Sequence, residues 1–220
     1  MGKNRGGGGI VNGTQERIQQ AQTDNDKIVQ SYDDSEKAFE TKEYQKEIES
    51  ITDYNLNIVN TGDKEEKKAL EGYTGTKYME INKELRSKGY NALTMDKDIR
   101  SQVDKIDKVL DKLKTKEQVY FRKVSVKGEN LKTFLNEHKV GNTVKYRSYT
   151  STSRERGHFG WNINYNNAAL LHIMGTPALI EKSSLLSEEK EGLFKRDSNF
   201  KIEAVKYIDN QPHIYMRQVS

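Results

Sequence analysis

The chain has 220 residues, of which 33% are hydrophobic and 32% charged, and its mean hydropathy is −0.95. This length favours one domain, or one domain with an appendage. No run approaches the roughly 20 apolar residues that span a bilayer, and the N-terminus lacks the apolar segment of a secretory signal. The absence of cysteine excludes disulfide scaffolds, thiol catalysis and cysteine-based metal sites.

The net charge of +4 is the small difference between 37 basic and 33 acidic residues. The two signs alternate along polar segments, as between Lys42 and Glu49, which is typical of a solvated helical surface. A nucleic-acid binder usually gathers its basic residues on one face or in one arm. We therefore expect no DNA or RNA partner.

The N-terminal quarter differs from the remainder in its sparse apolar residues. The glycine run Gly6–Gly9 predicts a flexible leader over residues 1–13. Residues 14–60 contain no proline, and their thin apolar pattern predicts one or two helices that lie on another part of the protein. A mobile leader over residues 1–30 is the alternative. Residues 61–220 are predicted to form the main domain.

Helical spacing becomes clear after Lys64 and continues to Gly89, although Gly72 and Gly75 interrupt it, which predicts two short helices or a break. Apolar residues at i, i+4, i+7, i+11 and i+14 predict an amphipathic helix over residues 99–113.

The pattern changes to that of strands after residue 116. Residues 119–126 are β-branched and aromatic, and residues 131–138 fit a short helix. Because the helices precede the strands, we predict an α+β fold rather than a doubly wound parallel sheet. The further predicted short strands or turns are residues 144–153, 168–174, 178–181, 192–195, 200–207 and 213–219.

No histidine pair has the spacing of a metal site, so we expect structural or surface histidines and no bound metal. The four histidines, each isolated in the sequence, are His138, His158, His172 and His213.

Two polar features interrupt the predicted strands. Arg122 lies inside an apolar strand, and arginine suits bidentate binding of phosphate oxygens. The hydroxyl residues Tyr149–Ser153 end a strand, where they can orient a carboxylate or a ligand hydroxyl. Taken singly, an exposed strand arginine and an ordinary polar strand end are the alternatives.

A pair of carboxylates precedes another strand. If Glu191 begins that strand, Glu189 and Glu191 lie on the same side, at most about 7 Å apart. Two carboxylates so placed are a plausible pair for glycosidic chemistry. An acidic loop is the alternative.

The order of these features resembles the Arg–Ser–Glu signature of mono-ADP-ribosyltransferases. Arg122 precedes an S-T-S strand over residues 151–153 and an E-x-E segment over residues 189–191. The resemblance is to the exoenzyme class, which includes binary actin-modifying toxins and phage or bacterial effector transferases. It covers about residues 64–207, and the further segments that carry it are 69–74, 78–86, 169–173, 177–180 and 191–202.

The resemblance implies helices followed by two abutting, mainly antiparallel sheets. It also implies that NAD is a substrate whose ADP-ribose is transferred to a target while nicotinamide is released. Glu191 would stabilise the cationic ribose through its 2′-hydroxyl. Ser151 would hold Glu191, with Thr152 and Ser153 securing the strand end, and Arg122 would bind the NAD phosphates.

Further positions around the NAD site follow from the same resemblance. Tyr78 and Asn82 would line the pocket, with Tyr73 as their packing partner. In the loop after Ser153, Phe159 or Trp161 would stack on nicotinamide.

Glu189 indicates which side chain would accept the ADP-ribose, because in this class an E-x-E segment accompanies arginine acceptors. A carboxylate can bind a guanidinium and accept its proton. We therefore expect modification of an arginine on a target protein, with residues 182–188 as the recognition loop and Leu185 and Leu186 as its apolar contacts.

Two departures from the family pattern concern packing and target. Gly192 stands where Ile or Val is usual, and Lys123 stands where some actin-modifying relatives carry a second arginine, which weakens the case for actin. We expect a monomeric toxin or effector that binds no membrane and acts in the cytoplasm of a host or target cell after delivery. The alternatives are a non-catalytic partner-binding module on the same scaffold and an NAD glycohydrolase.

Overall fold

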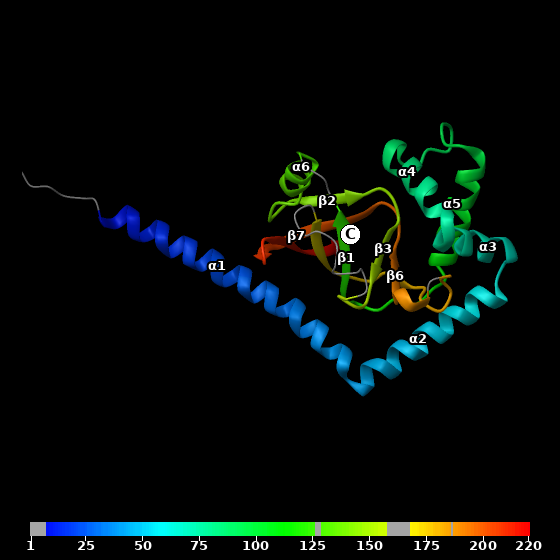
Figure 1. The fold of residues 1–220 in the computed structure, drawn as a ribbon, viewed down its shortest axis with the longest axis horizontal. Helices are drawn as coiled ribbons and strands as arrows, with labels where there is room; N and C mark the ends of the chain where they lie inside the picture. Colours follow the sequence, from blue (N-terminus) through cyan, green and yellow to red (C-terminus); the bar gives the residue numbers. More distant parts are fainter. Residues whose placement is uncertain (1–7, 126–128, 158–167, 186) are drawn as a thin grey trace, which may run out of the picture.

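The computed structural model describes residues 8–125, 129–157, 168–185 and 187–220. Apart from one α-helix that follows the first strand, the described α-helices come first in the chain and an eight-stranded mixed sheet follows, which confirms the α+β class (Figure 1). The helices are α1 (Gly8–Lys37), α2 (Lys42–Thr61), α3 (Lys64–Gly72), α4 (Tyr78–Lys88), α5 (Lys97–Leu110) and α6 (Glu129–Glu137).

Every predicted strand segment contains a strand, and the segment 144–153 contains two. The strands are β1 (Gln118–Ser125), β2 (Thr143–Tyr146), β3 (Thr150–Ser153), β4 (Ala168–Gly175), β5 (Ala178–Leu179), β6 (Glu191–Phe194), β7 (Ser198–Ile208) and β8 (Gln211–Val219).

The strand order is β2-β7-β8-β4-β1-β3-β6-β5, and only the β4–β8 pair is parallel. The sheet is therefore mainly antiparallel, as predicted. The expected two abutting sheets are instead joined into one, because β1 and β3 pair at Phe121 and Ser153. That single residue pair is the junction between a larger and a smaller half of the sheet.

The helices α3, α4 and α5 pack over the smaller half. Asp96 caps α5 by accepting hydrogen bonds from the N–H groups of Asp98 and Ile99. The apolar stripe of this helix is buried against α3 and the sheet, which confirms the predicted amphipathic helix. Where a break was predicted around Gly72 and Gly75, a π-helical turn over Tyr73–Lys77 joins α3 to α4.

The helices α1 and α2 meet at a sharp bend, and α1 extends beyond the body of the protein (Figure 1). Both lie on the sheet, as predicted from their thin apolar faces: Val29 and Tyr32 of α1 pack near Phe121, and Tyr44 of α2 packs near Tyr120. The helix α1 begins at Gly8, inside the predicted leader, while the leader's first seven residues lie outside the described ones. No described helix is long and apolar enough to cross a membrane.

The structure explains the glycine at position 192. A Cβ there would lie 2.8 Å from Cε1 of Tyr120 and 2.9 Å from Cγ of Pro177. The Tyr120 hydroxyl donates to the carbonyl of Lys116 at 2.8 Å, which fixes the ring in this place. The tyrosine ring thus fills the space that an Ile or Val side chain would need.

We expect Gly192→Val to lower the free energy of unfolding by about 1–3 kcal/mol, because the added methyl groups overpack a closed site. Adding Tyr120→Leu should recover part of this loss. Denaturant titrations of the three proteins measure both effects. An unchanged midpoint for Gly192→Val would show that the Tyr120 ring is free to move away.

Candidate active site

The E-x-E segment lies where β6 begins. Glu191 is the first residue of β6 and pairs with Ser153 of β3. Its side chain reaches a cavity of about 210 Å³ between the sheet and the helices. The lining residues are Tyr73, Thr74, Tyr78, Ser151, Glu189 and Glu191. Strand pairing thus brings Ser151 beside the two carboxylates, and the π-helical turn brings Tyr73 over them.

Glu191 is a buried carboxylate, with 5% of its surface exposed. Burial raises the pKa of Glu191, and the charge of Glu189 raises it further. Hydrogen bonds from the hydroxyls of Ser151 and Ser184 act in the opposite direction, but they do not offset the burial. The cavity therefore contains a carboxylate that little water solvates.

A chain of hydrogen bonds leads from α4 to this carboxylate. The amide of Asn82 donates to the Tyr73 hydroxyl at 3.0 Å, and Tyr73 is also hydrogen-bonded to Ser151. Burial raises the pKa of Tyr73 to about 12, so its hydroxyl stays protonated at neutral pH. Tyr73, expected as a packing partner, thus links Asn82 to Ser151, and Asn82 lies behind it instead of lining the cavity.

Thr152 and Ser153 hold the strand end. The Thr152 hydroxyl donates to the carbonyl of Gly192 at 2.6 Å. The Ser153 hydroxyl accepts from the N–H of Glu155 at 3.0 Å. Both are buried, and neither lines the cavity around Glu191.

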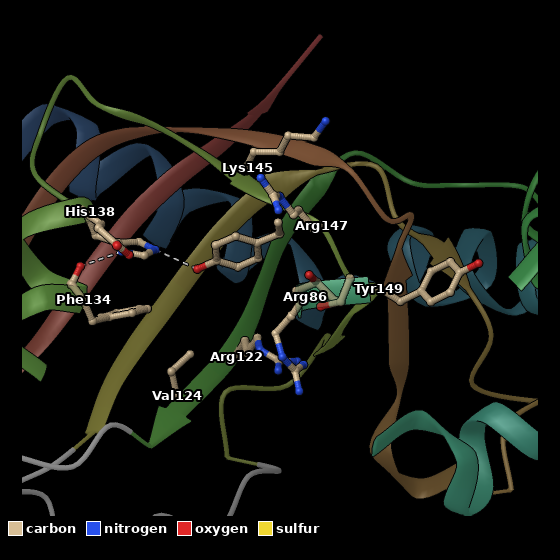
Figure 2. Close-up of a pocket in the computed structure, with 12 residues that line it drawn as sticks. Arg86, Arg122, Val124, Phe134, His138, Lys145, Arg147 and Tyr149 are labelled. Carbon is tan, nitrogen blue, oxygen red and sulfur yellow. Dashed lines mark hydrogen bonds between the residues drawn. The ribbon is translucent and has the colours of Figure 1, made fainter. Parts of the chain in front are cut away.

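Arg122 lies on the other side of β3 and lines a second cavity of about 400 Å³ (Figure 2). Its guanidinium donates to the carbonyl of Ser151 at 2.5 Å, so it contacts the strand that faces Glu191. Burial lowers the pKa of Arg122, and the charge of Arg86 lowers it further. An arginine nevertheless keeps its charge in proteins.

The second cavity is basic. Arg86, Lys145 and Arg147 line it together with Arg122, and Figure 2 shows the guanidinium groups of Arg86 and Arg122 near each other. Arg86 is not among the residues predicted from the sequence, although it follows Asn82 by one helical turn within the segment 78–86 that carries the resemblance. Lys145 and Arg147 gave no such signal, because they stand among other exposed cations.

The loop before β6 supplies part of the rim. Leu185 is 64% exposed, and its N–H donates to the Thr74 hydroxyl at 3.3 Å. Leu186, Phe159 and Trp161 lie outside the described residues.

Two of the histidines that looked isolated meet in the sheet. Nε2 of His172 and Nδ1 of His213 are 3.0 Å apart, and burial lowers the pKa of His213 to about 4. His138 closes one end of the basic cavity, where its Nε2 is 2.8 Å from the Tyr146 hydroxyl (Figure 2). Among the described residues, no group of three or more His, Asp or Glu could hold a metal ion.

One comparison with known proteins shows the family, and another shows similar folds. The model of the ADP-ribosyltransferase exoenzyme family matches residues 36–218. The C3 exoenzyme of Clostridium limosum has a similar structure, with a TM-score of 0.65 at 22% identity over 80% of this chain and 94% of that chain. The search of the curated proteins found no match.

Two further solved structures are similar in fold. The ADP-ribosyltransferase Vis, a toxin from Vibrio splendidus, was solved in complex with agmatine and has a TM-score of 0.60 at 21% identity, over 78% of this chain and 86% of that chain. C3stau2 from S. aureus was solved with NAD and has a TM-score of 0.63 at 17% identity, over 79% of this chain and 95% of that chain.

We expect Glu191→Gln to raise the free energy of unfolding at neutral pH. Burial raises the pKa of Glu191 in the folded protein above its value in the unfolded chain. Folding therefore favours the protonated carboxyl, and the free energy of unfolding falls as the pH rises from the unfolded to the folded pKa. Each pH unit between the unfolded and folded pKa is worth about 1.4 kcal/mol.

Urea titrations at several pH values measure the effect, which should shrink toward zero below the unfolded pKa. The exposed Glu43→Gln serves as the control and should show no gain. A Glu191→Gln protein less stable than the parent at neutral pH would mean that the bonds from Ser151 and Ser184 outweigh the burial.

Proposed function

Because the chain belongs to the ADP-ribosyltransferase exoenzyme family, we propose that it transfers ADP-ribose from NAD to an arginine side chain of a target protein and releases nicotinamide. The observation that carries this proposal is the buried Glu191 carboxylate, which is hydrogen-bonded to Ser151 and stands two residues from Glu189 in the same cavity. The NAD complex of C3stau2 and the agmatine complex of Vis support it, since agmatine carries a guanidinium group.

The diphosphate of NAD matches the basic cavity. Arg122 and Arg86 present two guanidinium groups there, and guanidinium groups bind phosphate oxygens through paired N–H donors. Because Arg122 also donates to the carbonyl of Ser151, the phosphates would be held at a fixed place relative to β3. The nicotinamide ribose would then extend toward Glu191.

The chemical step breaks the bond between the ribose C1′ and the nicotinamide nitrogen. The electron pair leaves with nicotinamide, which becomes neutral, and positive charge develops on the ribose ring. A carboxylate in a site of low polarity stabilises that charge more strongly than it stabilises the ground state. Glu191 supplies this carboxylate, and the Tyr73–Ser151 hydrogen bonds keep it in place.

Transfer follows when a guanidinium nitrogen of the target bonds to C1′ and loses one proton. Glu189 lines the same cavity and is half-buried, so it can bind the guanidinium and accept that proton. Leu185 at the rim would contact the apolar surroundings of the target arginine. Where water attacks instead, the product is free ADP-ribose.

The family match begins at residue 36, and α2 packs on the sheet, so both observations concern where the catalytic domain begins. We propose residues 61–220 as the catalytic domain and residues 14–60 as its helical extension. We also propose that the protein acts as a toxin or effector within a target cell. Vis and Plx2a from Paenibacillus larvae are both named as toxins, which supports the first part of this proposal.

We expect Glu191→Gln to slow nicotinamide release by a factor on the order of 10²–10³, because it removes the charge that meets the ribose cation. Nicotinamide release from NAD, followed by chromatography, measures this effect. The exposed Glu43→Gln serves as the control. Release at the parental rate by Glu191→Gln would remove Glu191 from the reaction.

We expect Glu189→Gln to spare the hydrolysis of NAD and to abolish transfer to agmatine. The amide cannot accept the proton that the guanidinium must lose. Mass spectrometry of the ADP-ribosylated agmatine measures the transfer. If the parent hydrolyses NAD but modifies neither agmatine nor any arginine of a cell lysate, arginine is the wrong acceptor.

We expect Arg86→Met to raise the KM for NAD about tenfold or more with little change in kcat, because it removes one charged hydrogen-bonding partner of the diphosphate. Steady-state kinetics of NAD hydrolysis measure both constants. Lys83→Met, an exposed change on the same helix, is the matched control. An unchanged KM for Arg86→Met would place the diphosphate elsewhere.

A further inference from the structure

A buried ion pair flanks the strand that carries Glu191. Arg154 directly follows β3, and Glu181 lies two residues after β5. Two guanidinium nitrogens of Arg154 donate to Oε2 of Glu181, at 3.0 Å from Nε and 2.7 Å from Nη2. The exposed fractions of the two residues are 6% and 8%.

The pair lies on the face of the sheet away from the cavity. Side chains alternate along β6, so Glu191 faces the π-helical turn and α4 while Gly192 faces Tyr120. Arg154 reaches the hydroxyl of Tyr44, which packs in the same core cluster as Tyr120, and this places the pair on the second face. Neither residue lines the cavity around Glu191 or the basic cavity.

Stability alone does not account for such a pair. Removing two charges from water is costly, and apolar side chains of similar size often replace a buried pair without loss of stability. Here the pair is tied into a wider set of contacts, because Arg154 also reaches the Tyr44 hydroxyl at 3.5 Å, and that hydroxyl donates to Gln118 at 2.6 Å. The contacts join α2 and β1 to the ends of β3 and β5.

The same two chain segments hold the backbone of the E-x-E segment. The N–H of Arg154 donates to the carbonyl of Lys190 at 3.1 Å, and the N–H of Ile180 donates to the carbonyl of Glu191 at 3.0 Å. Lys190 has a φ of 45°, a left-handed conformation that a residue with a Cβ seldom adopts without outside support. Because β6 lies between β3 and β5, the ion pair links the chain segments on the two sides of β6.

We propose that Arg154 and Glu181 are positioning residues that set the direction of Glu189 relative to Glu191, an inference that rests on the proposed function. Glu191 has other supports, namely the β3 register and the hydroxyls of Ser151 and Ser184. Glu189 directly precedes Lys190, whose carbonyl accepts the hydrogen bond from the N–H of Arg154. Loss of the ion pair should therefore impair transfer to a guanidinium more than cleavage of NAD.

The test replaces the pair by apolar side chains, in the double variant Arg154→Met with Glu181→Met. Rates of nicotinamide release and of agmatine modification give the ratio of transfer to hydrolysis. We expect this ratio to fall at least about tenfold, because a small misplacement of a reacting group is costly. The KM for NAD should stay within about twofold of the parental value, because the diphosphate site is untouched.

The matched control is the double variant Lys116→Met with Glu47→Met. It removes an exposed ion pair that also joins α2 to the sheet region, and the ratio should not change. A merely structural role for Arg154 and Glu181 would lower the melting temperature and both rates together, without altering their ratio. Should the apolar double variant not fold, Arg154→Lys takes its place, because lysine keeps the charge but loses the fork of donors.

A folded double variant, or a folded Arg154→Lys, with the parental ratio would overturn the positioning role and leave the proposed function intact. A parent that releases no nicotinamide, or that modifies neither agmatine nor any arginine of a cell lysate, would instead overturn the proposed function, and this inference with it.

Discussion

The candidate site depends on one costly placement, a carboxylate buried where two halves of a sheet meet. Burial of a charge is unfavourable unless hydrogen bonds replace the lost water. The hydroxyls of Ser151 and Ser184 do so only in part, and the pKa of Glu191 remains raised. The same lack of water strengthens the attraction between this carboxylate and a developing cation. Under the proposed function, therefore, the burial of Glu191 lowers the stability of the fold and strengthens the stabilisation of the ribose cation.

The junction of the sheet explains why the two cavities adjoin. β1 and β3 pair at one position, Phe121 with Ser153, so further along β3 no ladder partner on β1 faces the carbonyl of Ser151. The guanidinium of Arg122 donates to this carbonyl instead. The Arg122 side chain thus takes the place of a strand partner at this point. The carboxylates lie on one side of β3, and the cations of the basic cavity lie on the other.

Local patterns in the sequence predicted most elements, because alternation and helical spacing record which face of each element is buried. The order of Arg122, the S-T-S strand and the E-x-E segment selected residues that strand pairing brings into neighbouring places, and their roles in a reaction stay a prediction. Features that depend on distant contacts could not be predicted. The meeting of His172 with His213 and the join between the two sheet halves both rest on residues far apart in the sequence. Arg86 has no periodic signal, since it is one exposed cation on a polar helix.

The helix α2 stabilises the edge of the sheet next to the site. β5 is a two-residue edge strand, and an edge that short has few hydrogen bonds of its own. Asn55 of α2 donates to the carbonyls of Leu179 and Lys114 and accepts from the N–H of Lys114, all within 2.9 Å. This side chain and the isolated bridge between Thr115 and Ala178 together take the place of a full neighbouring strand. Because β5 leads directly to Glu181 and the loop before Glu189, the position of α2 bears on the geometry of the carboxylates, although none of its residues lines their cavity.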